Sequence, residues 1–214
     1  MPQARDKVRR NVASLITVPE GRAGRPSKAM TLAQAVQLLA TLNSAASFRL
    51  SAYVVLSLLT GVRTEEARAL LWSEVDLDAG TVAVYRSVRA KGDTKTRRSR
   101  RVLKLPRKVV AALRAHRRRH MAERLRAGDA WQDHGLVFCR EDGTALDHWQ
   151  VRRELGQITK AAGLGEQWTP RELRHSFVSI LSASDVPLED ISQLIGHVLP
   201  TSPRRCTGTR SGLR

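Results

Sequence analysis

Apolar residues recur at helical spacing in the first part of the chain. Residues 31–42 open with the pattern of a capping box, Thr31 and Gln34, and continue with an apolar stripe of Leu32, Val36 and Leu39. Residues 48–59 are nearly all apolar, so a helix there is expected to be buried on most sides and to stop at Gly61. A shorter helix is predicted within residues 61–72, with Thr64 as its N-cap.

Longer amphipathic helices are predicted in the second half of the chain. Residues 107–127 predict a helix with a basic outer face and an inner face of Val109, Leu113 and Leu125. Residues 147–162 predict another. The helix that begins near Pro170 carries an apolar stripe of Leu173, Phe177, Ile180 and Leu181. A last helix is expected from Pro187 to Gly196, because proline favours helix starts and glycine favours helix ends.

The pattern changes to strands in the middle of the chain. Residues 81–88 alternate and are rich in β-branched side chains, and residues 100–106 read as their partner strand. The basic loop 91–99 between them predicts a β-hairpin, and residues 136–139 predict one more short strand. The predicted fold class is therefore mainly α with a small antiparallel β-sheet (α+β).

Charge is the feature of the composition that narrows the function. The 214 residues carry a net charge of +17, which favours a polyanionic partner, most often nucleic acid. A basic structural protein is the alternative that charge alone leaves open. Cys139 and Cys206 have neither metal-ligand spacing nor a disulfide framework, and no apolar run is long enough to span a bilayer. A cytoplasmic, DNA-associated location is expected, with neither membrane nor metal as partner.

Two arginines and a histidine are the first candidates for chemistry. Arg171 and Arg174 are three residues apart on a predicted helix, so their side chains are neighbours. Guanidinium groups bind phosphate oxygens in a fixed fork, and an anion would relieve their mutual repulsion. The alternative is a solvated basic helix face. His197 follows Gly196 at the end of the last helix, where a histidine is usually a surface or capping residue.

Four motifs occur in an order that resembles a known family. They are TGVRTEEARALLW at 60–72, TKTRRSRR at 94–101, PRELRHSF at 170–177 and LIGH at 194–197. This set resembles the catalytic domain of the tyrosine site-specific recombinases, the phage-integrase family, and looks closest to integrases of actinobacterial mobile elements. The resemblance covers about residues 29–197. It implies DNA integration and recombination through breaking and rejoining of double-stranded DNA at attachment-type sites, by a homo-tetramer and without a cofactor.

The resemblance also implies a role for each matching residue. Arg63 and Arg174 would contact the oxygens of the scissile phosphate, and Glu66 would be a structural acid. Lys95, in the hairpin loop, would protonate the leaving 5′ oxygen, and His197 would hydrogen-bond the phosphate. Charge develops on the phosphate oxygens during phosphoryl transfer, so preorganised cations suit this chemistry.

Other basic residues of the same motifs complete the candidate site. Lys91 and the neighbouring arginines are alternatives to Lys95, because a loop is hard to align. Lys91, Arg97, Arg98 and Arg100 are expected to bind DNA. The family usually has histidine where this chain has Arg171. Since arginine stays protonated, Arg171 could bind phosphate but could not accept a proton.

The nucleophile that the resemblance requires is missing from its expected place. The family has a tyrosine about nine residues after the histidine that matches His197, whereas residues 198–214 contain none. Tyr53 falls in the predicted apolar helix and Tyr85 in a predicted strand, so both are interpreted as structural. Cys206 is near the expected position, and a thiol could attack phosphorus in principle. We hypothesise that the reading frame changes just after His197, because a shifted frame can encode a tyrosine there; the nucleotide sequence tests this.

The sequence thus predicts three segments and leaves two functions open. Residues 1–28 are expected to be the remnant of an N-terminal core-binding domain with a basic linker, residues 29–199 the recombinase catalytic domain, and residues 200–214 an aberrant, disordered tail. The first function is a recombinase that is truncated and inactive as written. The alternative is a non-enzymatic DNA-binding remnant of an integrase.

Overall fold

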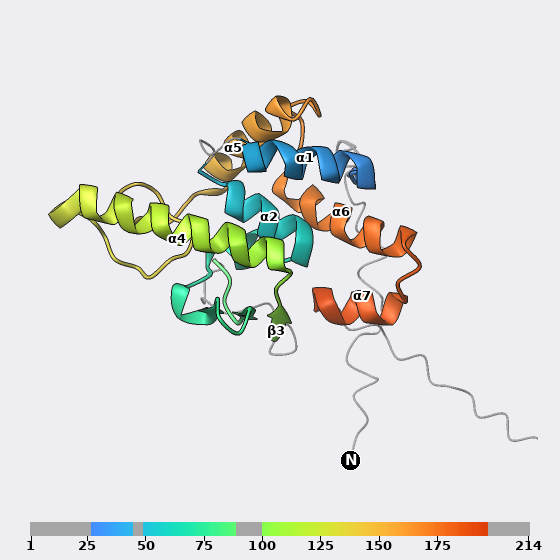
Figure 1. The fold of residues 1–214 in the computed structure, drawn as a ribbon, viewed down its shortest axis with the longest axis horizontal. Helices are drawn as coiled ribbons and strands as arrows, with labels where there is room; N and C mark the ends of the chain where they lie inside the picture. Colours follow the sequence, from blue (N-terminus) through green and yellow to red (C-terminus); the bar gives the residue numbers. More distant parts are fainter. Residues whose placement is uncertain (1–26, 45–48, 89–99, 197–214) are drawn as a thin grey trace, which may run out of the picture.

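The computed structural model describes residues 27–44, 49–88 and 100–196. Within these ranges the fold is mainly helical with a small antiparallel sheet, as predicted (Figure 1). The helices are α1 (Leu32–Ser44), α2 (Ser51–Thr60), α3 (Thr64–Arg68), α4 (Arg107–Ala127), α5 (His148–Ala161), α6 (Pro170–Ala183) and α7 (Leu188–Ile195), with short 3-10 turns at Trp72–Glu74 and Gly128–Ala130. The strands are β1 (Val75–Asp76), β2 (Thr81–Val84) and β3 (Arg101–Lys104).

Helix α2 lies at the centre of the helical body. Its residues are almost all buried, as the continuous apolar run predicts, and it packs against α4 on one side and α6 on the other (Figure 1). It ends at Gly61, whose φ of 64° lies in the left-handed region that glycine adopts without strain. A Cβ on Gly61 would lie 2.5 Å from Cδ1 of Phe177 in α6. This glycine therefore sets how closely the end of α2 approaches α6.

Helix α1 has the predicted start, and its apolar stripe is only partly buried. The Thr31 amide donates to the Gln34 side chain at 3.0 Å and the Gln34 amide donates to the Thr31 hydroxyl at 3.2 Å, which confirms the capping box. Of the apolar stripe at helical spacing, Leu39 packs against the core, whereas Leu32 and Val36 are 62% and 57% exposed. A second stripe is buried instead: Ala35, Leu38 and Leu42.

Helix α4 has the predicted bounds, and two of the three residues predicted for its inner face are buried. Val109 and Leu113 are fully buried, whereas Leu125 is 83% exposed because the last turns of α4 project beyond the helices that cover its first turns (Figure 1). His116 is buried on the inner face, where its Nε2 lies 2.6 Å from the Val137 carbonyl oxygen. Burial lowers the pKa of His116 to about 4, so the ring is neutral at physiological pH and its Nε2–H donates to this carbonyl.

The sheet has the order β1-β2-β3, with both pairs antiparallel. Strands β2 and β3 are the predicted hairpin partners, in a register that pairs Val84 with Arg101, but both are shorter than predicted. The loop 91–99 lies outside the described residues. Residues 136–139 do not form the predicted strand, because only isolated bridges pair Leu136 with Leu71 and Cys139 with Ala145.

Helices α5, α6 and α7 complete the body around α2. Asp147 caps α5 by accepting the Gln150 amide at 2.7 Å. The predicted stripe of α6 faces inward, with Leu173 fully buried and Phe177 9% exposed. Helix α7 ends at Gly196, also in the left-handed conformation, as its sequence predicts. Among the described residues, none of the helices is both long and apolar enough to cross a membrane.

Replacing Gly61 by alanine is expected to destabilise the fold through a clash as well as through the backbone. Gly165 is a matched control, because its φ is also positive, at 80°, but a Cβ there would meet nothing within 4 Å. Both variants should lose about 1–2 kcal/mol from the left-handed backbone. Gly61→Ala should lose about 1–3 kcal/mol more, since Phe177 has to move. Urea denaturation of both variants measures this difference, and equal losses would contradict the tight approach of α2 to α6.

Candidate phosphate-binding site

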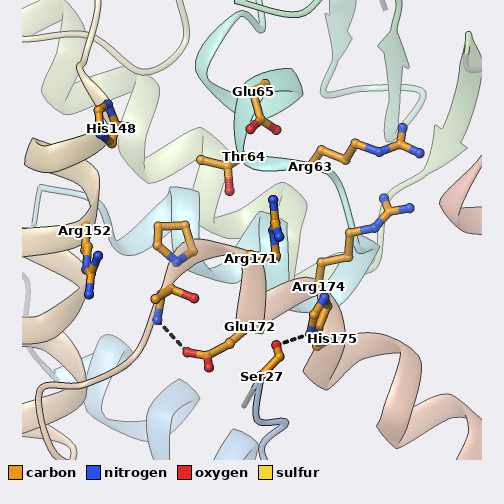
Figure 2. A pocket seen from close by; sticks show the side chains of 12 residues that line it. Ser27, Arg63, Thr64, Glu65, His148, Arg152, Arg171, Glu172, Arg174 and His175 are labelled. Atoms are coloured by element: carbon orange, nitrogen blue, oxygen red, sulfur yellow. Dashed lines mark hydrogen bonds between the residues drawn. The ribbon is translucent and has the colours of Figure 1, made fainter. Parts of the chain in front are cut away.

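The start of α6 is fixed by a carboxylate one turn into the helix. Glu172 accepts the Thr169 amide at 2.8 Å, and its other oxygen accepts the Lys28 amide at 3.2 Å (Figure 2). Pro170 occupies the first turn, where its missing amide hydrogen costs nothing. Because the helix start is held in this way, the positions of Arg171 and Arg174 relative to the core are also set.

Arg174 is buried, with 8% of its surface exposed, and does not lie on the helix surface as predicted. Its Nη1 donates to the Gly61 carbonyl at 2.5 Å and its Nη2 donates to the Ile195 carbonyl at 2.8 Å. Burial, followed by the positive charge of Arg63, lowers the pKa of Arg174 to about 10. Arg174 is therefore still a cation at neutral pH, although its burial and the charge of Arg63 both disfavour the charged form.

Arg63 precedes α3 and is held by Glu66. The Glu66 carboxylate accepts the Arg63 amide at 2.9 Å and Arg63 Nη1 at 2.6 Å. The helix therefore begins at Thr64, and Arg63 occupies the N-cap position that the sequence assigned to Thr64. The capping interaction comes from Glu66, because an arginine side chain cannot accept an amide hydrogen.

Arg63, Arg171 and Arg174 line one cleft with a volume of about 710 Å³ (Figure 2). The guanidinium groups of Arg63 and Arg174 extend in the same direction from α3 and α6, and Arg171 is exposed on the first turn of α6. Glu65 also lines the cleft, so the lining is not uniformly basic. A cleft lined by several guanidinium groups is suited to an oxyanion such as a phosphate group.

Several predicted site residues cannot be placed in this cleft. Lys91, Lys95, Arg97, Arg98 and His197 lie outside the described residues. Arg100 is described and exposed, directly before β3. The described chain ends at Gly196, and β3 begins one residue after Arg100.

Sequence reasoning missed three residues near the cleft. His148 and Arg152, one turn apart on the exposed face of α5, line it opposite Arg63 (Figure 2). Arg101 binds Glu66 from β3 and is only 9% exposed in its side chain. Burial of Arg101 could have been predicted from the alternation of side chains along the strand, because Arg101 shares a face with the buried Leu103 and Leu105.

Burial raises the pKa of Glu66, but Arg101 and Arg63 more than offset this effect. The hydrogen bond and charge of Arg101, with the backbone and side chain of Arg63, place the pKa of the Glu66 carboxyl below its usual value. Glu66 is thus ionised and accepts hydrogen bonds with both oxygens. Glu66 thus holds two arginines, Arg63 and Arg101, in the structure.

Other groups with possible chemistry lie away from the cleft. Tyr53 is 1% exposed and packs edge-on against Phe138, with ring centroids 5.3 Å apart, whereas Tyr85 follows β2 and is 41% exposed. Burial raises the pKa of the Cys139 thiol to about 11, which keeps it protonated. Within the described ranges, no group of three or more histidine, cysteine or acidic side chains could hold a metal ion.

Comparison with known sequences identifies relatives along most of the chain. The sequence profile of the phage integrase family matches residues 28–203. An integrase of Streptomyces ambofaciens is 53% identical over 205 residues, which are 91% of this chain and 52% of that protein. A tyrosine recombinase XerC-like protein of Caldanaerobacter subterraneus subsp. tengcongensis is 28% identical over 167 residues, 70% of this chain and 42% of that protein. The chain spans about half the length of these relatives.

Solved structures share the arrangement of helices and strands. The crystal structure of XerA recombinase superposes with a TM-score of 0.66 at 24% identity, over 83% of this chain and 58% of that one. The Tn1549 transposon integrase in complex with transposon right end DNA gives a TM-score of 0.67 at 17% identity, over 91% and 66%. At these identities the similarity concerns the fold. Together with the match over residues 28–203, it shows that the chain belongs to the phage integrase family and has the fold of a tyrosine recombinase catalytic domain.

Proposed function

We propose that the cleft binds a backbone phosphate of double-stranded DNA, as part of a site-specific recombination site that cleaves and rejoins strands. The observation that carries the proposal is that Arg63, directly before α3, and Arg171 and Arg174, in the first turns of α6, line one cleft. Membership of the phage integrase family and the net charge of +17 support DNA as the phosphate donor. Residues 29–199 are the proposed catalytic domain.

Each arginine contributes to phosphate binding in a different way. Arg174 is preorganised, because two carbonyls fix its guanidinium and little side-chain freedom remains to be lost. Arg63 is held by Glu66 but is still 28% exposed, so it can reach a ligand in the cleft. Arg171 is exposed and would contact the phosphate from the solvent side. Lys95 and His197 join them in the proposal on the strength of the sequence motifs alone.

The proposed cleavage step transfers one phosphoryl group. A tyrosine hydroxyl oxygen bonds to phosphorus and the bond from phosphorus to the 5′ oxygen breaks. The 5′ oxygen takes a proton from Lys95, and the tyrosine proton leaves to solvent, since Arg171 cannot accept it. The arginines stabilise the negative charge that builds on the two other phosphate oxygens. Rejoining is the reverse of this step.

A second candidate function, DNA binding without cleavage, is favoured by one observation. The two tyrosines of the sequence both lie away from the cleft: Tyr53 is buried in the core, and Tyr85, which is 41% exposed, does not line the cleft. We propose that the chain as printed binds DNA phosphates but does not form a phosphotyrosine bond. Recognition of attachment-type sites and assembly of a homo-tetramer are part of the first proposal, recombination. Recombination would need the tyrosine nucleophile and the partner protomers in addition to the phosphate cleft.

Neutralising the cleft arginines should weaken DNA binding more than neutralising an arginine elsewhere. Arg174→Gln and Arg63→Gln are each expected to weaken binding of a 20-base-pair duplex by about tenfold or more, because a preorganised charge-assisted contact is lost. Arg86→Gln is the matched control, since Arg86 pairs with Glu74 at 3.1 Å outside the cleft. Fluorescence anisotropy at several salt concentrations gives the affinities. If all three variants bind alike, the cleft is not the phosphate site.

Replacing residues 198–214 should decide between the two functions. The chain as printed is expected to give no covalent product with nicked suicide duplexes randomised around the nick. A chain whose tail is replaced by the shifted-frame sequence, with its tyrosine, should form a protein–DNA adduct, tested both alone and fused to the part of the Streptomyces ambofaciens integrase that lies outside the matched 52%. The same fusion with phenylalanine for that tyrosine is the control. An adduct with the unaltered tail would contradict the binding-only function.

A further inference from the structure

Arg101 connects three parts of the molecule that the phosphate cleft depends on. It is the first residue of β3, at the base of the hairpin that carries the basic loop. Its Nη1 and Nη2 donate to the two oxygens of Glu66 at 3.2 and 2.9 Å. Its Nε donates to the Leu194 carbonyl at 3.1 Å, in the last turn of α7. One side chain thus joins the sheet, α3 and the carboxyl end of α7.

The Arg101 side chain also lies close to the backbone at the end of α7. A Cβ built on Gly196 would lie 3.2 Å from Nη1 of Arg101 and 3.3 Å from its Cδ. Gly196 is therefore the residue that lets the chain pass over the guanidinium. The last carbonyls of a helix lack intrahelical donors and carry partial negative charge, so an arginine there is favourable. Two arginines donate to these carbonyls: Arg101 to that of Leu194, and Arg174 to that of the adjacent Ile195.

The charge around Glu66 gives Arg101 its functional importance. Glu66 is 3% exposed in its side chain and binds both Arg63 and Arg101. If Arg101 were absent, Arg63 would be the remaining arginine with an ion pair to Glu66, and Glu66 would offset more of the positive charge that Arg63 and the nearby Arg174 present to a phosphate. With Arg101 present, the acid is paired with a second guanidinium, at 2.9 Å between Arg101 Nη2 and Glu66 Oε2, and Arg101 is not among the residues that line the cleft whereas Arg63 is.

We propose that Arg101 is a positioning residue for phosphate binding. It offsets the negative charge of Glu66, so that the net charge that Arg63 and Glu66 present to the ligand stays positive, and it fixes the end of α7. This inference rests on the proposed phosphate-binding function of the cleft. Arg101 acts through Glu66 and Arg63 and has no contact with the phosphate. Its role therefore differs from that of Arg63 and Arg174.

A double-mutant cycle in the full chain tests the role of Arg101. Arg101→Met is expected to weaken binding of a 20-base-pair duplex by about tenfold, because Glu66 then neutralises Arg63. Adding Glu66→Gln should restore most of this loss, since the uncompensated acid is gone. Arg101→Lys should bind with intermediate affinity, because a lysine can neutralise Glu66 but cannot also reach Leu194 with a fork of donors.

The Arg86–Glu74 pair outside the cleft provides the matched cycle. Arg86→Met and its combination with Glu74→Gln make the same changes of net charge, so they measure the general effect of charge on DNA affinity. The coupling between Arg101 and Glu66 should exceed that between Arg86 and Glu74 by about fivefold in affinity. Equal couplings, or no recovery in the double variant at Arg101 and Glu66, would overturn the proposal.

Two further readouts separate this role from folding and from the function itself. Thermal melting checks each variant, and if Arg101→Met does not fold, the double variant at Arg101 and Glu66, which removes both buried charges, and Arg101→Lys carry the test. If Arg63→Gln and Arg174→Gln leave DNA binding unchanged, the phosphate-binding function fails. If those variants lose binding but Arg101→Met does not, only the positioning role fails.

Discussion

Arginines that bind helix ends hold this site together. The Arg174 guanidinium donates to the carbonyl of Gly61, directly after α2, and to that of Ile195, the last residue of α7, and Arg101 donates to Leu194 in the last turn of α7. The partial negative charge at helix carboxyl ends offsets part of the cost of bringing these cations together. Glu66 offsets more of it, because it binds Arg63 and Arg101 at once. The site is thus assembled from cations that are paired well enough to be buried but still leave net positive charge.

This arrangement explains why the fold places tight turns around the arginines. Gly61 and Gly196 both end helices in the left-handed conformation, and a Cβ at either would press against Phe177 or Arg101. The carbonyls at these ends can be reached by guanidiniums only because the backbone comes close. The sheet contributes through Arg101, whose strand also leads to the basic loop. Packing of α2 against α6 and charge pairing around Glu66 therefore support the same cleft.

Much of the fold and part of the site followed from the sequence. The capping box at Thr31, the long helix 107–127 and the helix ends at Gly61 and Gly196 depend on local chemistry, and local patterns predicted them correctly. The sequence did not indicate which apolar side chains of α1 are buried, because that helix has two apolar stripes and the choice between them is made by α2 and α5, which pack against it. Burial of Arg174 was missed for a similar reason, since its two carbonyl partners come from distant parts of the chain. Arg101 could have been found from strand alternation, but its acid partner could not.

The central claim is that Arg63 and Arg174 bind a DNA phosphate in one cleft. The most direct measurement is the NMR signal of each arginine Nε–H in the full chain during titration with a double-stranded DNA duplex. The account predicts that the signals of Arg63 and Arg174 shift together with one dissociation constant, and that the signal of Arg86, outside the cleft, follows only weakly. Shifts confined to Arg86 and other exposed arginines, with Arg63 and Arg174 unchanged at saturation, would contradict it.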